Sequence, residues 1–160
     1  MCDYSLMAVP NRLAQEGEEL VAYRFPTGSL GLASPTDVKR ATYVPPASRS
    51  FWTNLKLFFS PPNHVPAPAV CIPPGARLRL EGIPARMQAE LGVGPVEDVT
   101  FTQLTAAANT YRDAVRFSNG KTIRLQEWRE GLRVHVLDLS SADPLDLEVL
   151  RREITEVVRL

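Results

Sequence analysis

The chain has 160 residues with 18 basic and 18 acidic side chains, and 44% of its residues are hydrophobic. This length suits a single domain that buries its own core, and the composition excludes a disordered chain, a collagen and a small disulfide scaffold. A formal net charge of zero argues against a dedicated nucleic-acid-binding protein.

The chain begins Met1-Cys2-Asp3 and shows no secretory signal, because the basic and apolar segments of such a signal are missing from its first residues. No stretch of 18 apolar residues occurs, so we expect no transmembrane segment. We therefore expect a cytoplasmic protein in which the two cysteines are thiols rather than a disulfide.

Residues 1–33 predict two strands. The first covers 4–9 and ends at Pro10, and the second covers 20–25 and ends at the Pro-Thr-Gly break that follows it.

Residues 34–75 differ from the rest of the chain in composition, because they hold nine of the 14 prolines. Proline has no amide donor and a fixed φ, so we expect a long irregular loop that is partly polyproline II. The loop also carries large apolar side chains, which a disordered linker lacks. We expect them to pack on their own core, on a second copy, on another protein or on a membrane surface; the candidates are Phe51, Trp52, Leu55, Phe58 and Phe59.

Residues 76–160 are the most regular part. Their patterns predict a strand over 76–80, a short helix over 84–91, and an antiparallel meander over 96–139. Asp143 and Pro144 then predict the start of a C-terminal helix with an apolar stripe that covers one face of the sheet.

The strongest local signal is a hairpin around Asn119-Gly120. A three-residue loop over 118–120 places Val115 opposite Ile123 and Arg116 opposite Thr122, which separates apolar from polar faces better than a two-residue loop does. We therefore predict a bulged turn with Gly120 in the left-handed region. In this register Asp113 lies on the Val115 side, and we interpret it as a strand-end residue at the solvent margin.

Taken together, these patterns predict one α+β domain over 1–160. It combines an antiparallel sheet of hairpins, a C-terminal helix packed on the sheet, and a proline- and aromatic-rich excursion over 34–75.

Four pieces of the chain resemble a family of small, uncharacterised bacterial proteins. They are the opening Met-Cys-Asp-Tyr-Ser-Leu, the stretch 69–75, the hairpin from Asp113 to Lys121, and the final strand. The resemblance implies a bacterial source and no particular chemistry. The aromatic stretch 43–68 is longer than that family leads us to expect.

Cys2 is the first candidate for chemistry. Removal of Met1 would leave a terminal cysteine whose amine can act as the base for its own thiol, or whose sulfur and nitrogen can bind a soft metal. Its alternative role is that of a small, partly buried apolar residue.

The chain also contains one set of metal-binding residue types, namely Cys2, Cys71, His64 and His135. Four such donors can hold Zn or Fe when they converge on one point, but the spacing follows no known metal motif. The ordinary alternatives are a loop histidine at position 64 and a solvated strand-face histidine at 135. Ser29 lies in a Gly-Ser-Leu-Gly sequence that does not match a nucleophile elbow, so we interpret it as a turn.

The sequence therefore supports two functions. The first is a small cytoplasmic binding protein, or an accessory subunit of a larger assembly, that binds a metal or ligand through Cys2 and Cys71. The alternative is an N-terminal-cysteine enzyme, either a hydrolase or metal-dependent, with Cys2 as nucleophile or ligand.

Overall fold

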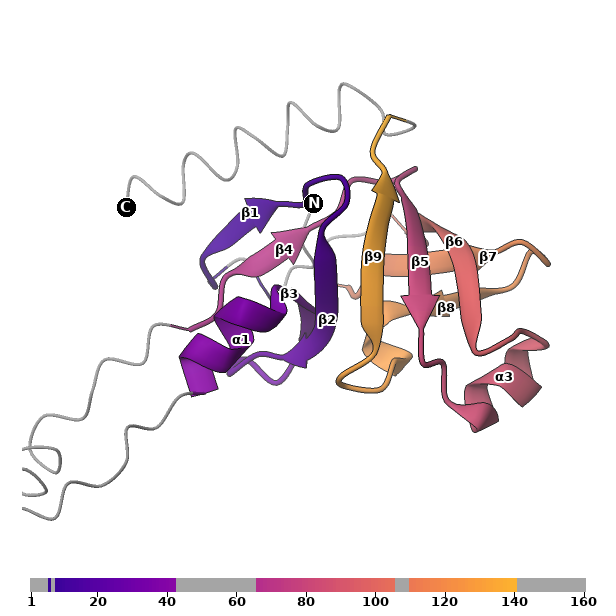
Figure 1. Ribbon diagram of the computed structural model, residues 1–160, viewed down its shortest axis with the longest axis horizontal. Helices are drawn as coiled ribbons and strands as arrows, with labels where there is room; N and C mark the ends of the chain where they lie inside the picture. The colour runs from indigo at the N-terminus through magenta and orange to yellow at the C-terminus, as the bar shows by residue number, and fades with distance from the viewer. Residues whose placement is uncertain (1–5, 7, 43–65, 106–109, 141–160) are drawn as a thin grey trace, which may run out of the picture.

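The computed structural model describes residues 6, 8–42, 66–105 and 110–140. This part of the chain forms short strands and helices around a strongly curled sheet (Figure 1). The strands are β1 (Asn11–Leu13), β2 (Glu19–Arg24), β3 (Leu30–Ala33), β4 (Ala69–Cys71), β5 (Arg77–Glu81), β6 (Val96–Gln103), β7 (Asp113–Phe117), β8 (Thr122–Arg124) and β9 (Arg133–Asp138). The helices are α1 (Pro35–Thr42), α3 (Ala85–Leu91) and the 3₁₀ turn η2 (Leu125–Glu127).

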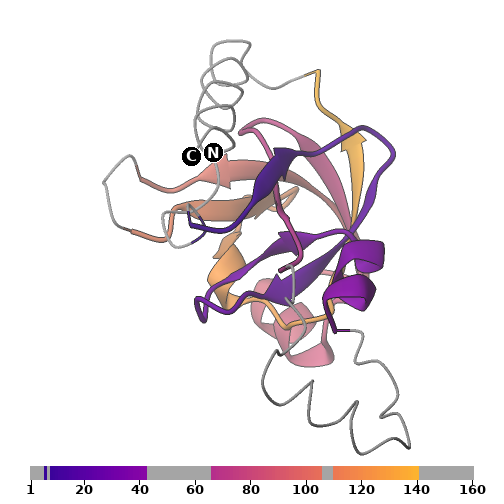
Figure 2. The same cartoon turned by 90° about the vertical axis from the view of Figure 1, so that its left-hand side faces the viewer.

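Seven of the described strands form one antiparallel sheet in the order β3-β2-β9-β5-β6-β7-β8, and β1 pairs with β4 in a separate parallel pair. The large sheet wraps around its own concave face, as the view in Figure 2 shows. The side-chain amide of Gln126 in η2 joins its two ends: Nε2 donates to the Leu30 carbonyl at 2.6 Å, and Oε1 accepts from the Leu30 amide at 2.9 Å. A side chain thus makes the pair of bonds that an adjacent strand would make.

Apolar side chains that alternate along the strands fill the concave face. Val99 and Phe101 of β6 face the same interior as Val134 and Val136 of β9. A smaller cluster lies between α1, β2 and the residues next to β4, where the Tyr23 and Phe25 rings pack edge to face at 5.0 Å. The α+β class is confirmed in this coarse form.

The hairpin prediction is confirmed. Val115 pairs with Ile123 and Arg116 with Thr122, and Gly120 has a φ of 83°. The short helix also forms as predicted, with Pro84 as its N-cap and Gly92 as a left-handed C-cap at φ 65°.

Three other predictions need correction. Leu6, Ala8 and Val9 are not part of a strand. β1 instead begins after Pro10, so the proline, which has no amide N–H to donate, lies outside the strand. The segment 34–75 is not irregular throughout, because it contains α1, which begins at Pro35 in a first-turn position that tolerates proline, and β4. The run 96–139 is not a simple meander, because β9 returns to the middle of the sheet between β2 and β5.

The predicted C-terminal helix and the aromatic stretch with Phe51, Trp52, Leu55, Phe58 and Phe59 lie outside the described residues. Within the part of the chain that the structure describes, no helix combines the length and hydropathy needed to cross a membrane.

Candidate functional site

A surface hollow of about 370 Å³ lies between α3 and the segment that follows β8. Its apolar floor consists of Met87 of α3, Ile123 of β8 and Trp128, which are all buried or nearly so. Charged side chains surround this floor and form a polar rim. The remaining lining residues are Pro84, Arg86, Glu90, Glu127 and Arg129.

The turn of the β7–β8 hairpin holds α3 in place. Nδ2 of Asn119 donates to the Leu91 carbonyl at 2.9 Å, and Nζ of Lys121 donates to the Glu90 carbonyl at 3.0 Å. These bonds satisfy carbonyls that the helix end leaves without an internal partner. The same hairpin therefore supplies Ile123 to the floor and fixes the helix that carries Met87.

The side of the hollow across from α3 is held in place by η2. The two bonds between Gln126 and Leu30 hold this turn against β3, and the Trp128 amide donates to the Leu125 carbonyl at 3.1 Å. Trp128 follows directly and enters the core, where only 4% of its surface is exposed.

The indole Nε1 of Trp128 is buried and has no hydrogen-bond partner among the residues that the structure describes. Leaving a buried donor unsatisfied costs on the order of 1–3 kcal/mol. Unsatisfied buried groups are uncommon in folded proteins. The residue that carries this donor lines the hollow, but the nitrogen itself lies behind the floor and is not accessible from it.

The rim of the hollow carries both signs of charge. Arg86 and Glu90 form an exposed ion pair at 2.8 Å, so each largely neutralises the other. Glu127 and Arg129 also line the hollow, and neither forms an ion pair with any described residue. One carboxylate and one guanidinium are therefore available at the rim.

Cys71 lies in β4 with 3% of its surface exposed, and it is disulfide-bonded rather than a free thiol. This differs from the expectation of reduced cysteines. A disulfide sulfur is not a thiolate, so Cys71 offers no metal ligand in this form. Cys2 and His64 lie outside the described residues.

His135 lies on the outer face of β9, where its Nε2 is 3.5 Å from Oε1 of Glu81. Cys71 is buried in β4 of the other sheet, whereas His135 is only partly buried. No group of three or more metal-binding side chains forms within the described residues. The four-residue metal set stays a prediction, because half of it is not described.

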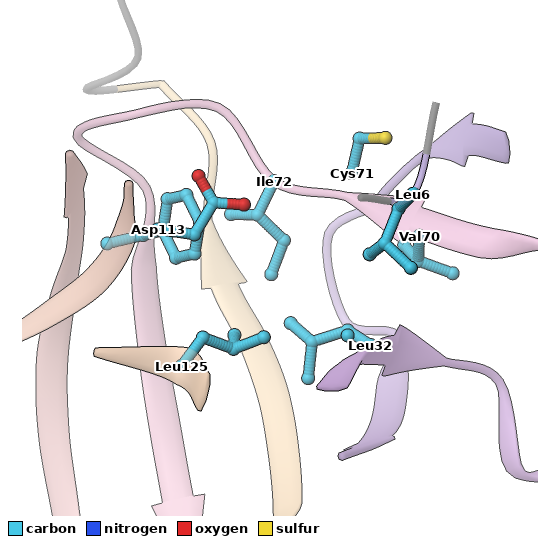
Figure 3. Close-up of a pocket in the computed structure, with 9 residues that line it drawn as sticks. Leu6, Leu32, Val70, Cys71, Ile72, Asp113 and Leu125 are labelled. Atoms are coloured by element: carbon cyan, nitrogen blue, oxygen red, sulfur yellow. The ribbon is translucent and has the colours of Figure 1, made fainter. Parts of the chain in front are cut away.

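Asp113 is buried, with 6% exposure, so its placement at the solvent margin is wrong. It faces inward, as the hairpin register requires, and Nε2 of Gln103 donates to it at 3.2 Å. Asp113 and Cys71 line opposite ends of one small cavity, and Figure 3 shows the sulfur pointing away from the carboxylate. The cavity volume is about 10 Å³, room for about one water molecule and too little for a ligand.

Ser29 lies between the turn at 26–27 and the start of β3, where it is buried, and its hydroxyl lies 3.3 Å from that of Tyr111. Sequence reasoning missed the residues of the hollow. A signal was present in the run from Gln126 to Gly131, where one tryptophan stands among charged residues just before a turn. Such a tryptophan must either enter the core or cover a surface site.

Comparison with protein-family models, with curated proteins and with solved structures gave no significant match.

Proposed function

We propose that this protein is a small ligand-binding protein whose ligand occupies the hollow between α3 and Trp128. The apolar floor of Met87, Ile123 and Trp128 beneath a charged rim is the observation that carries the proposal, since small-molecule pockets combine an apolar lining with a few polar groups. The volume of about 370 Å³ supports it too, because pockets for small molecules start at about 300 Å³.

The proposal keeps the binding function expected from the sequence and moves the site away from the cysteines. Cys71 supports this move, because its sulfur is already bonded. A disulfide also supports an oxidising compartment more than the reducing cytoplasm expected from the sequence. Chemistry at Cys2, a metal held with His64, and partner contacts through the aromatic stretch stay separate predictions.

Binding can be tested by nuclear magnetic resonance on the full ¹⁵N-labelled chain with the neutral probe 2-phenylethanol. The chain has two tryptophans, Trp52 and Trp128, so a Trp52→Phe variant assigns the Trp128 indole signal. We expect this signal and the amides of Met87, Ile123 and Arg129 to shift in a saturable way. Shifts elsewhere only, or none at millimolar probe, would refute the proposal.

Trp128→Phe provides a second test, because it keeps an aromatic ring and removes part of the apolar floor. We expect the variant to bind the probe about fivefold more weakly, which corresponds to about 1 kcal/mol, or about 40 Å² of lost apolar contact. Leu137→Ala is the control, since Leu137 is exposed on β9 and does not line the hollow. A probe affinity that is the same in Trp128→Phe and in the wild type would mean that the probe does not contact the Trp128 floor, and would count against this site.

A further inference from the structure

We infer that the ligand of this hollow is a zwitterion with an aromatic body, of the class of a free aromatic α-amino acid. The inference rests on the proposed binding function and concerns only the identity of the ligand. Its basis is that Glu127 and Arg129, with opposite charges and no ion-pair partner among the described residues, line the same apolar hollow.

The floor favours an aromatic body. Trp128 offers a ring, and Met87 offers a thioether with 9% of its residue surface exposed. Aromatic rings pack well against both groups, with offset or edge contacts to the indole and sulfur contacts at the ring edge. Ile123 completes an apolar surface for the part of the ligand without charge.

The rim favours two opposite charges. The Arg129 guanidinium is exposed and matches a carboxylate, which it can bind through two parallel hydrogen bonds. Glu127 is two residues away along the chain, also exposed, and matches an ammonium group. Arg86 and Glu90 already pair with each other, so they add little net charge to the rim and do not change which ligand charges it favours.

A ligand with a single charge would use only one of these groups. An α-amino acid carries its carboxylate and ammonium on one carbon, beside an apolar side chain that can reach the floor.

Four probes with the same phenyl body separate the contributions of the carboxylate and of the ammonium group to binding. They are L-phenylalanine, 3-phenylpropionate, 2-phenylethylamine and the neutral 2-phenylethanol. Dissociation constants come from titrations that follow the amides of Met87 and Arg129. We expect L-phenylalanine to bind at least tenfold more tightly than 2-phenylethanol, and each singly charged probe about threefold more tightly. Equal affinities for all four would overturn the inference and leave the binding function standing, whereas no binding at all would refute both.

Charge-removing variants assign the charges to residues. Arg129→Gln should weaken L-phenylalanine and 3-phenylpropionate by threefold or more and leave 2-phenylethylamine unchanged. Glu127→Gln should weaken L-phenylalanine and 2-phenylethylamine and leave 3-phenylpropionate unchanged. Arg116→Gln is the matched control, because Arg116 is exposed on β7 and does not line the hollow. A uniform loss across all probes in either variant would indicate a purely structural role and overturn the assignment.

Discussion

At the scale of single residues, the outer face of the sheet shows how neighbouring strands place opposite charges together. Arg79 of β5 is opposite Asp98 of β6 and donates two hydrogen bonds to its carboxylate, at 2.8 and 3.2 Å. These bonds lower the pKa of Asp98 below its usual range, mainly through the hydrogen bond and next through the positive charge of Arg79. Stability gained from a carboxyl group with a lowered pKa is present at neutral pH and is lost in acid.

Asp98→Asn tests this pair. Because the pKa of Asp98 is lowered on folding, the stability that this carboxylate contributes is complete above its unfolded pKa of about 4. That stability disappears as the pH falls through the lowered pKa of the folded state. We expect the variant to be less stable than wild type at pH 7 and equally stable at the acid end, by urea unfolding across pH 2–7. The gap should be small, because both side chains are exposed.

The control for this prediction is the same change in an Arg79→Gln background. With the guanidinium of Arg79 gone, Asp98→Asn should produce a much smaller pH-dependent stability gap, because only the weaker attraction of Arg77 still lowers the pKa of Asp98. A gap of constant size from pH 2 to 7 in the wild-type background would contradict the prediction.

Single residues were also the hardest to predict. The inward position of Asp113 followed from the hairpin register, but its burial did not, because burial depends on what covers the end of a strand. Trp128 could be identified only as an apolar residue near a turn. Whether its N–H finds a partner depends on atoms from distant segments, which no local pattern contains.

At the scale of elements, local signals were reliable where one face of an element is buried. The two-residue period of β7 and β8 determined the hairpin register, because a slip by one residue would expose Val115 and Ile123. The helix α3 was predictable from Pro84 and Gly92, whose backbone preferences suit the two ends of a helix. In contrast, α1 was missed, since proline enrichment around it indicated a loop.

The contact between η2 and β3 gives an element-scale prediction. Gln126→Ala removes both bonds to the Leu30 backbone, which we expect to cost about 1–3 kcal/mol, because the contact is partly buried. Hydrogen exchange should show faster exchange at the Leu30 amide, and urea unfolding should give the loss of stability.

Gln126→Glu is the matched comparison, because it keeps an acceptor for the Leu30 amide and loses the donor to the Leu30 carbonyl. Its amide exchange at Leu30 should lie between those of the wild type and Gln126→Ala. Unchanged exchange at Leu30 in Gln126→Ala would show that η2 does not hold this edge of the sheet.

At the scale of the whole molecule, strand order was not predictable from the order of the elements along the chain. β9 follows β8 in sequence but pairs with β2 and β5, far from β8 in the sheet. The chain returns through η2 and the turn at Gly131, whose φ is 87°. This return carries Trp128 and Arg129 past α3, so the strand order that sequence reasoning missed is also what creates the hollow.

The disulfide at Cys71 gives the prediction that concerns the whole chain. Cys2 is the only other cysteine in the sequence, so a bond within one chain requires it and would close a loop of roughly 70 residues. Such a crosslink restricts the unfolded chain and stabilises the folded one by about 4 kcal/mol in the chain-entropy model. We expect dithiothreitol to lower the urea midpoint of the wild type, and Cys71→Ser to show the lower midpoint with or without reductant.

Mass spectrometry separates the alternatives for this bond. A non-reduced digest should yield one peptide pair that joins Cys2 to Cys71, and non-reducing electrophoresis should show a monomer. A covalent dimer would instead place the bond between two chains. An intact chain that reacts with two equivalents of iodoacetamide in denaturant without reductant would contradict the disulfide, and would return Cys2 to its role as a candidate nucleophile. The redox state of these two sulfurs therefore decides whether thiol chemistry or the hollow beside Trp128 is the better guide to function.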